Sequence, residues 1–407
     1  MNILRLAAVL VLSLTLGPLA ACDSGGSAGS SGGDGTTDGT TDGTTDGTTD
    51  GATDEPDPPP APVCNPASDV TGTGVIGLVY RDENTTDISH DAMGFEEGTD
   101  TPLEGETVKL LTWGGVEWSA TTCEGGDYGF SNLPAGVYLV EPQLDTRDCR
   151  SRNCPRQVAD AVRSGTIKVV TMGDSVPVVG DKPTFPDRLA ALLGGLATVD
   201  NANIAVGGTT SNHWLPGTTY CDSYLLPEVT DADVLVISLG GNDILEYVNN
   251  VFNGGGGLGG DLVGGAMELV VQIVDNVMST VDAVREVNPD IDVVYCLYPN
   301  YGEATSTSPW NLVGNFLGAE TMIELLDTAR GAIPYESGLI LADMYAGFEG
   351  LPLDDYLYDS LHFNHAGATL YAEIIFQSLG GVFVGDSPLP PHGASPLGAI
   401  HDFGISP

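Results

Sequence analysis

Basic residues are scarce in this sequence. Its 407 residues include 13 Lys and Arg against 56 Asp and Glu, which gives a formal net charge of −43. Nucleic acids and anionic membrane surfaces are bound through clustered Lys and Arg, because phosphate groups are negatively charged. So acidic a chain argues against both as partners and says nothing about the fold. We expect no nucleic-acid partner.

Long apolar runs are also lacking. After Arg5, an apolar run covers residues 6–16, which is shorter than the ~20 residues that span a bilayer. It leads into Leu19-Ala20-Ala21-Cys22, which resembles a bacterial lipobox. The resemblance implies that residues 1–22 are a lipoprotein signal peptide and that Cys22 is lipidated. An ordinary cleaved signal is the alternative. We expect an exported protein of the bacterial cell envelope, attached to a membrane through this cysteine.

Residues 23–63 have little capacity to form a core. Thr-Thr-Asp-Gly repeats four times between Thr36 and Gly51, and a Pro-rich stretch follows. Such a composition buries almost no apolar area, so it predicts a disordered, solvated tether. Its carboxylates could bind Ca²⁺ weakly, but a charged spacer is the favoured interpretation.

Six cysteines follow Cys22, and none forms a Cys-His cluster with the spacing of a zinc site. We therefore expect no metal ion. An exported protein meets oxidising conditions, so disulfides are plausible, although six cysteines allow many pairings. The pairs we favour are Cys149–Cys154, Cys64–Cys123 and Cys221–Cys296.

Residues 64–143 contain short strand-like runs separated by turns, which is typical of a β-sandwich. The runs cover residues 75–80, 107–111, 116–118, 128–130 and 137–140. The segments 77–84, 102–105 and 127–138 resemble prealbumin-like modules of the SdrD B-domain and carboxypeptidase-regulatory type. Some such modules bind Ca²⁺, for which Asp82, Glu83 and Asn84 are candidates. A structural spacer is the favoured role.

Six of the 13 basic residues lie between Asp145 and Lys168, mostly within a linker at 144–165. We expect this basic segment to dock on an acidic neighbouring domain; an anionic ligand site is the alternative. At the other end of the chain, the Pro-rich residues 386–407 are expected to form an extended tail.

Residues 166–385 show strands alternating with helices, which predicts a parallel sheet covered on both faces. Val270, Ile273, Val274 and Val277 begin an apolar stripe at helical spacing. The expected strands cover 167–172, 199–206, 233–239, 291–297 and 339–341, and the helices 185–193, 270–284, 320–329 and 366–379.

Polar residues follow the strands of this predicted sheet. Ser175 follows the first strand, Gly208 the second and Asn242 the third, while Asp359 and His362 precede the last helix. Because the carboxyl ends of parallel strands share one edge, we expect these residues to converge there. A serine hydroxyl becomes nucleophilic when an imidazole takes its proton, and a carboxylate orients the imidazole. Backbone N–H groups and an amide can stabilise the oxyanion that forms on an ester.

Gly-Asp-Ser, Gly-x-Asn-Asp and Asp-x-x-His occur here in the order found in SGNH, or GDSL-like, hydrolases, which the domain resembles over about 220 residues. The resemblance implies a flavodoxin-like three-layer α/β/α fold with nucleophile Ser175, base His362 and orienting Asp359. It implies oxyanion donors in the Ser175 and Gly208 N–H groups and the Asn242 amide. Gly207 is the alternative glycine. Val176-Pro177 replaces a leucine common in relatives.

Several nearby residues are expected to serve structure. Asp174 should shape the turn, Asp243 should cap a helix, and His365 should pack or hydrogen-bond locally. His213 and Trp214 are expected to be a surface pair, with a place at the substrate rim as the alternative. Residues 254–260 are Gly-rich without a nearby cation, so we expect a loop and no phosphate site.

The sequence thus predicts an exported, lipid-anchored serine esterase that forms an acyl-enzyme and needs no cofactor. We expect a small-molecule or polysaccharide ester as substrate, with a carbohydrate O-acetyl ester favoured and a lipid ester second. The rival hypothesis is a non-catalytic surface-binding lipoprotein, against which the complete Ser, Asn, Asp and His set argues. One fold hosts many substrates, so fold cannot decide between these esters.

Overall fold

The computed structural model describes residues 64, 66–70, 73–81, 100–144, 155–253, 262–301, 319–334, 337–385, 389 and 400–405. The chain divides into two units, Met1–Pro58 and Pro59–Pro407, and all described residues belong to the second. The signal peptide with Cys22, the tether 23–63, the Ca²⁺ candidates at 82–84 and the loop 254–260 lie outside the described residues. Among the described helices, none is both long and apolar enough to cross a membrane.

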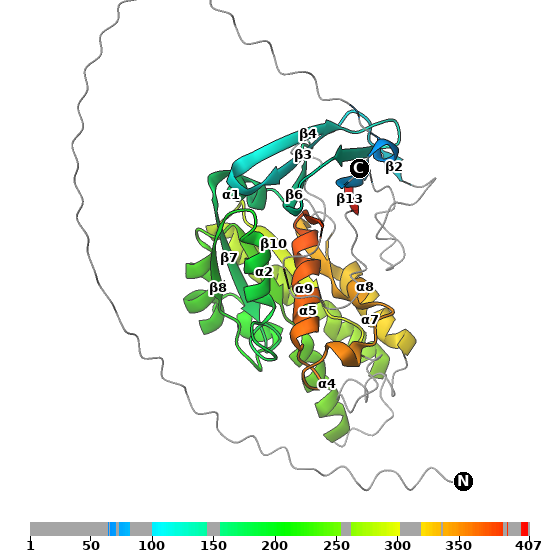
Figure 1. Ribbon diagram of the computed structural model, residues 1–407. Coiled ribbons are helices and arrows are strands. Elements are labelled where there is room, and N and C mark those ends of the chain that lie inside the picture. Colours follow the sequence, from blue (N-terminus) through cyan, green and yellow to red (C-terminus); the bar gives the residue numbers. More distant parts are fainter. Residues whose placement is uncertain are drawn as a thin grey trace, which may run out of the picture. The chain divides into compact units, whose positions relative to one another are not determined.

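A five-stranded parallel sheet forms the centre of the hydrolase-like domain (Figure 1). The strands pair in the order β11-β10-β9-β7-β8. Counted along the chain this is the order 2-1-3-4-5 of flavodoxin-like folds, so the predicted fold class is confirmed. The strands are β7 (Thr166–Gly173), β8 (Thr198–Asn203), β9 (Val234–Ser238), β10 (Asp292–Leu297) and β11 (Leu339–Asp343).

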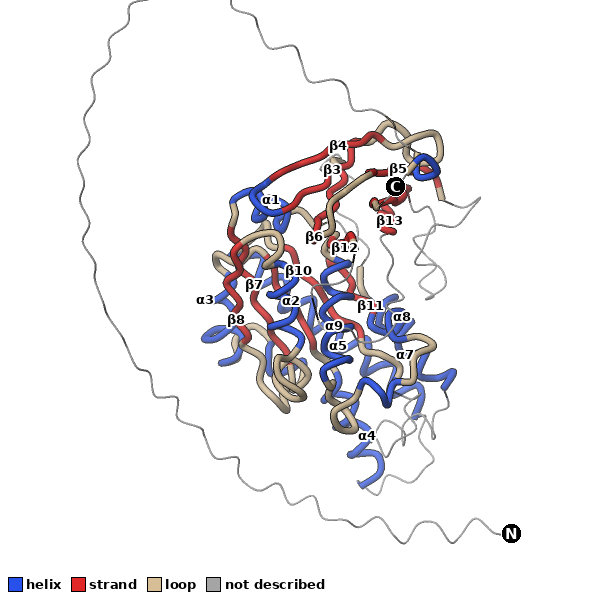
Figure 2. The backbone as a smooth tube through the Cα atoms, viewed as in Figure 1, coloured by secondary structure: helices blue, strands red, loops and turns tan. Residues whose placement is uncertain are grey.

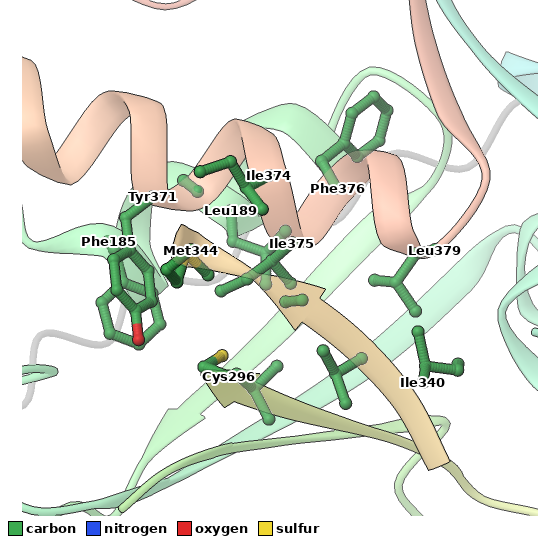
Figure 3. Packing of buried hydrophobic residues seen from close by; sticks show 14 of the residues in the cluster. Phe185, Leu189, Cys296, Ile340, Met344, Tyr371, Ile374, Ile375, Phe376 and Leu379 are labelled. Atoms are coloured by element: carbon green, nitrogen blue, oxygen red, sulfur yellow. The ribbon is translucent and has the colours of Figure 1, made fainter. Parts of the chain in front are cut away.

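Two apolar clusters cover the two faces of this sheet. Because side chains alternate along a strand, Val234 and Val236 enter one cluster while Leu235 and Ile237 enter the other. On the first face, α2 (Phe185–Leu193) and α9 (His365–Ser378) lie side by side (Figure 1). Figure 3 shows Ile375 and Leu189 of these helices packed near Cys296 and Ile340 of the sheet.

The helices largely occupy the predicted segments. Pro186 stands in the first turn of α2, and the Asn364 side chain caps α9 by accepting from the N–H groups of Ala366 and Gly367. The helices are α1 (Gln157–Ser164), α2 (Phe185–Leu193), α3 (Leu226–Val229), α4 (Gly241–Asn253), α5 (Leu262–Val287), α7 (Ala319–Ala332), α8 (Met344–Phe348) and α9 (His365–Ser378). Short helical turns cover Ala67–Asp69, Trp113–Gly115, Ser211–Trp214, Tyr220–Leu225 and Leu353–Tyr356.

One predicted disulfide is confirmed and one is wrong. Cys64 and Cys123 are bonded, with their Cα atoms 5.4 Å apart. Cys221 and Cys296 are free and buried, and they belong to the clusters on opposite faces of the sheet. The sheet therefore separates their sulfur atoms, whereas a disulfide needs Cα atoms within about 7 Å. Cys149–Cys154 lies outside the described residues.

The strands of the N-terminal β region form two sheets in which they pair antiparallel to one another. The C-terminal part of the chain adds one strand to each sheet. β12 (Gly381–Val384) pairs with β6 (Gly136–Pro142), beside which it lies in Figure 2. β13 (Ile400–Ile405) pairs parallel to β1 (Gly74–Arg81). Part of the expected hydrolase domain, 166–385, and part of the expected tail, 386–407, are thus strands of the N-terminal module. The module's other strands are β1 (Gly74–Arg81), β2 (Thr101–Pro102), β3 (Thr107–Thr112), β4 (Val116–Thr121), β5 (Asp127–Ser131) and β6 (Gly136–Pro142).

The β module shares a core with the α/β domain. Leu111 and Leu139, from β3 and β6, belong to the same buried cluster as α1, α2 and α9. The Arg163 guanidinium of α1 forms ion pairs with Glu117 and Glu141 of the module. These contacts agree with the expected docking of the basic segment on an acidic neighbour, although the segment begins outside the described residues.

Candidate active site

Ser175 lies just beyond the carboxyl end of β7, the strand where the order of the sheet reverses. Gly173 ends this strand with φ +150°, and a Cβ there would lie 2.0 Å from the carbonyl oxygen of Ser238 on β9. Only glycine allows so close an approach. The Asp174 N–H then donates to the same Ser238 oxygen at 3.1 Å. The turn carrying Ser175 is therefore fixed directly to the neighbouring strand.

Ser175, His362 and Asp359 form one hydrogen-bonded chain. Ser175 Oγ lies 2.9 Å from His362 Nε2, and His362 Nδ1 lies 2.8 Å from Asp359 Oδ2. With the Nδ1 proton donated to the carboxylate, Nε2 is the lone-pair acceptor for the serine hydroxyl. Residues separated by more than 180 positions in sequence thus meet as predicted.

The loop before α9 fixes the position of the Asp359 carboxylate relative to the His362 imidazole. Asp359 Oδ1 accepts from the N–H groups of Leu361 and His362, each at 2.8 Å, and Tyr358 N–H donates to the His362 carbonyl. Partial burial raises the pKa of Asp359, but hydrogen bonds from His362 and from these N–H groups more than offset it. The pKa of Asp359 therefore lies below its ordinary value, which keeps the carboxylate charged at neutral pH.

The loop carrying Gly208 is tied to the end of β7. Val206 N–H and Thr209 Oγ1 both donate to the Gly173 carbonyl, at 3.0 and 3.1 Å. Gly208 has φ +84°, a conformation that favours glycine. A Cβ on the preceding Gly207 would lie 3.7 Å from the Ser175 Cβ, so the loop passes directly beside the serine.

Asn242 connects the third strand to the same loop. Its side-chain Nδ2 donates to the Thr209 carbonyl at 3.0 Å. An amide nitrogen carries two N–H donors, so this bond fixes the side chain and leaves the second donor for another acceptor. Asn242 stands in the first turn of α4, directly after β9.

Asp243 serves a role different from the expected helix cap. It lies inside the first turn of α4, and its carboxylate accepts from both the N–H and the hydroxyl of Ser211, the latter at 2.6 Å. Asn276 of α5 donates to the same Ser211 hydroxyl. Burial raises the pKa of Asp243. Asp243 thus anchors the turn that follows Gly208 instead of capping its own helix.

His213 and Trp214 do not form a surface pair. His213 is exposed, but Trp214 is fully buried, with its Nε1 donating to Thr209 Oγ1 at 3.0 Å. Trp214 therefore supports the Gly208 loop from beneath. The sequence contained no signal for this burial, because a single aromatic next to a histidine fits surface and core equally well.

Two tyrosines that sequence reasoning missed support the site. The Tyr298 hydroxyl donates to Asp174 Oδ2 at 2.6 Å, and the Tyr301 hydroxyl donates to the Leu361 carbonyl at 2.9 Å. Burial raises the pKa of Asp174 to about 6, and the hydrogen bond from Tyr298 opposes that rise. Both tyrosines follow β10 at the edge that carries the site, and this position was the only available signal.

His365 lies apart from the serine. Its Nδ1 is 2.9 Å from Arg188 Nη2, a local hydrogen bond of the kind expected. In the described part of the chain, no group of three or more His, Cys, Asp or Glu side chains is placed to hold a metal ion. The convergent groups are therefore a hydroxyl, an imidazole, a carboxylate and N–H donors, a set suited to acyl transfer.

Part of the α/β domain matches a known protein family. Residues 171–370 match the GDSL-like Lipase/Acylhydrolase family. No curated protein matches the chain.

Several solved structures are similar. A lipase from a goat rumen metagenome is 18% identical, covering 53% of this chain and 98% of its own, with a TM-score of 0.43. An extracellular lipase from Streptomyces rimosus is 17% identical, covering 52% and 99%, with a TM-score of 0.38. A two-domain esterase active on acetylated mannans is 18% identical, covering 61% and 58%, with a TM-score of 0.38. The matched residues of this chain, 171–370, form a domain of the GDSL-like lipase/acylhydrolase family.

Proposed function

We propose that this protein is a serine esterase that hydrolyses acyl esters through an acyl-enzyme. The observation that carries the proposal is the hydrogen-bonded chain from Ser175 through His362 to Asp359 at the carboxyl edge of the sheet. The match to the GDSL-like Lipase/Acylhydrolase family supports it.

In the first step, Ser175 Oγ attacks the carbonyl carbon of the ester while His362 Nε2 takes the hydroxyl proton. Asp359 stabilises the imidazolium that forms, because its carboxylate faces Nδ1. The tetrahedral intermediate then collapses. Its bond to the alcohol oxygen breaks, His362 returns the proton to the leaving alcohol, and the acyl group remains on Ser175.

In the second step, water attacks the acyl-enzyme. His362 takes a proton from the water molecule, and hydroxide adds to the carbonyl carbon. Collapse of this second intermediate breaks the bond to Ser175 Oγ, which recovers its proton from His362. The carboxylic acid leaves, and both side chains return to their starting protonation.

Negative charge on the carbonyl oxygen needs donors in both steps. We assign this role to the N–H groups of Ser175 and Gly208 and to the free donor of the Asn242 amide. The hydrogen bonds from Val206 and Asn242 hold the Gly208 loop and the amide next to the serine before substrate arrives. Such preorganised donors are worth about 10²–10³ in rate each in comparable sites.

Ser175→Ala is the direct test. We expect the purified protein to hydrolyse members of a panel of small acyl esters and acetylated polysaccharides, and the variant to lose this turnover while its circular dichroism is unchanged. Ser279→Ala, on the exposed face of α5, is the matched control and should keep full activity. Wild-type rates in a folded Ser175→Ala variant would show that Ser175 is not the nucleophile.

Two candidate substrates follow from the residues. Predicted export and a predicted tether suit an ester on a polymer outside the cell, so a carbohydrate O-acetyl ester is the first candidate. A lipid ester is the second, and an apolar cavity beside the site favours it. A purely binding role would not require the complete set of Ser, His, Asp and Asn, so this set argues against it.

We also propose that the protein is attached to a membrane through acyl chains on Cys22, as the Leu-Ala-Ala-Cys sequence suggests. Cys22→Ser should move the protein from the membrane pellet to the soluble fraction of fractionated cells. Unchanged pelleting of this variant would rule out the lipid anchor.

A further inference from the structure

Tyr358 has the most exposed large apolar side chain in the described part of the chain. It is 59% exposed and directly precedes Asp359. Within the described residues, neither its ring nor its hydroxyl has an aromatic or hydrogen-bonding partner. Its side chain therefore contributes little to the fold, although it stands next to the groups proposed to react.

Tyr358 lies directly opposite His362 in a tight antiparallel turn. The Tyr358 N–H donates to the His362 carbonyl at 2.7 Å. The next pair of the turn is Leu357 with Phe363. Opposed residues of antiparallel segments extend their side chains from the same face, with Cβ atoms about 5 Å apart, and successive pairs alternate between the faces. Phe363 is buried in the apolar cluster of the domain, and Leu357 packs against that cluster. Tyr358 and His362 therefore share the opposite face, from which the imidazole reaches Ser175.

The backbone on both sides of Tyr358 is held in place. Asp359 Oδ1 accepts from two N–H groups of the turn, each at 2.8 Å. The Asn364 side-chain amide donates to the Leu357 carbonyl at 3.3 Å. A ring presented by a fixed backbone loses little conformational freedom when it binds a ligand, so this contact would cost little entropy.

The alcohol part of the substrate is the part that reaches this face. His362 Nε2 returns a proton to the oxygen of the leaving alcohol, so that oxygen must lie next to the imidazole. The carbonyl oxygen is directed instead to the proposed oxyanion donors, among them Gly208 and Asn242. Tyr358 shares its face with the imidazole and is therefore placed to contact the alcohol.

The charge of this region favours a neutral alcohol. Residues 331–407 contain nine Asp or Glu and no Lys or Arg, and the lowered pKa of Asp359 keeps it charged. Such carboxylates repel phosphate and uronate groups. Lys182, in the loop after Ser175, donates its ammonium to the Val178 carbonyl of its own loop at 2.6 Å.

A sugar ring matches an exposed tyrosine better than a linear chain does. One side of a pyranose presents several C–H groups, which are attracted to the negative face of an aromatic ring. The sugar hydroxyls stay in water, and the phenol hydroxyl can donate to one of the sugar oxygens. A hydrocarbon chain would gain little from a single ring that leaves most of it in water.

We propose that Tyr358 is the specificity residue of a subsite for the alcohol part of the ester, where its ring stacks on a neutral sugar. The inference rests on the proposed esterase function and adds the chemical class of the alcohol. Ser175 attacks the acyl group carried by a sugar hydroxyl, and the sugar ring lies against Tyr358 while His362 protonates the departing oxygen.

Two acetate esters isolate the alcohol, because both leave the same acetyl group on Ser175. Glucose pentaacetate carries its esters on a neutral sugar ring, whereas ethyl acetate has no ring. The kcat/KM for each is measured by acid release in a pH-stat with the purified protein. Damage to the serine or the base lowers both values, so the ratio of kcat/KM for the glucose ester to that for ethyl acetate reports the contact with the alcohol.

Tyr358→Ala should lower this ratio by about two- to tenfold, the range that one aromatic contact supplies. Tyr358→Phe keeps the ring and should keep the wild-type ratio. Tyr224→Ala is the matched control, because Tyr224 is 51% exposed in the helical turn Tyr220–Leu225, which leads through α3 to the amino end of β9. Its ratio should be unchanged. Circular dichroism shows whether each variant is folded. If Tyr358→Ala is unfolded, Tyr358→Gln, which also lacks the ring, replaces it.

The outcomes separate the inference from the function on which it rests. An unchanged ratio in the folded variant without the ring overturns the subsite and leaves a Ser175-dependent esterase. A ratio in Tyr358→Phe as low as that in Tyr358→Ala overturns stacking, because the hydroxyl would then account for the effect.

Octyl acetate tests the linear alternative. If Tyr358→Ala lowers its kcat/KM relative to ethyl acetate as far as that of the glucose ester, the contact is a general apolar one and the sugar assignment fails. Absence of Ser175-dependent turnover of all three esters overturns the proposed function, and the subsite with it.

Discussion

At the scale of single residues, a few short contacts with the backbone hold the reactive side chains in place. Gly173 brings β7 against Ser238, and Asp359 fixes the loop of His362 through two N–H groups. The reactive Ser, His, Asp and Asn residues could be predicted from the sequence, because ester hydrolysis requires these side chains. Their supports, Tyr298 and Trp214, could not, since an isolated tyrosine or tryptophan in the sequence fits the surface, the core and a site equally well.

Asp359→Asn should lower kcat strongly. Because Asp359 Oδ1 accepts from two backbone N–H groups, the NH2 group of asparagine would face Nδ1, where it favours the wrong tautomer and carries no charge to stabilise the imidazolium. Comparable substitutions in triads cost about 10⁴ in rate. The loss will be smaller if a backbone carbonyl can orient the ring. Asp355→Asn, on the exposed side of the preceding turn, is the control and should keep wild-type kcat. Equal rates for the two variants would show that Asp359 does not orient the base.

The two neighbouring histidines should behave differently in one assay. His362 contacts Ser175, whereas His365 contacts Arg188. His362→Ala should therefore be inactive, and His365→Ala should keep most of its activity. An active His362→Ala variant and an inactive His365→Ala variant would show that His362 is not the base.

At the scale of elements, alternation and helical spacing predicted the five strands of the sheet and the helices α2, α7 and α9 to within about three residues, whereas α5 begins at Leu262 instead of 270 and α4 was given no range. α2 covers 185–193 as expected, and α5 ends at Val287 before Pro289. The strands β12 and β13 were missed because they are short and far in sequence from their partners. A local pattern carries no information about such long-range pairing.

Helix α1 was also missed, because its first turn is capped from a distant strand. Its Ncap residue, Arg156, makes no side-chain cap, and the carboxylate of Asp292 at the start of β10 accepts from the N–H groups of Arg156 and Val158 instead. The sequence contains no local capping signal, since the capping group lies more than 130 residues away.

The buried Asp292 should make stability depend on pH. Burial raises its pKa from 3.8 to about 7, although the N–H groups of α1 oppose the rise. Between these values the unfolded chain loses the proton and the folded chain keeps it, so the free energy of unfolding should fall as pH rises from about 4 to about 7. The full effect is of the order of 4 kcal/mol.

Asp292→Asn tests this at the same site. The amide keeps an acceptor oxygen for α1 and cannot titrate, so its free energy of unfolding, measured by urea denaturation, should decline less than that of the wild type over this interval. Parallel pH profiles for the two proteins would show that Asp292 is not the titrating group.

At the scale of the whole molecule, the described β module and α/β domain share one apolar cluster. Leu139 of β6 is 1% exposed within it, and β12 joins the end of α9 to the module. The expectation of a structural spacer did not include such a shared core. The sequence pattern distinguished a β region from an α/β region, but it could not show that β12 and β13 belong to the β module or that the two regions share buried side chains.

Leu139→Ala should therefore destabilise both parts together. Truncating a buried leucine costs about 2–5 kcal/mol, and the melting curve should move to lower temperature as a single transition. Loss of esterase activity on heating should move with it. Val116→Ala, at a position 52% exposed on β4, is the control and should melt like the wild type. Two separate transitions, with activity following only the unchanged one, would show that the domains fold independently.

The central claim is that His362 activates Ser175 as a nucleophile. Labelling with a fluorophosphonate tests it most directly, because this reagent bonds covalently to serine hydroxyls activated by a neighbouring base. Peptide mass spectrometry should find one modified residue, Ser175, and no modification in His362→Ala. Modification of another serine, or unmodified Ser175 in a protein that still hydrolyses esters, would contradict the claim.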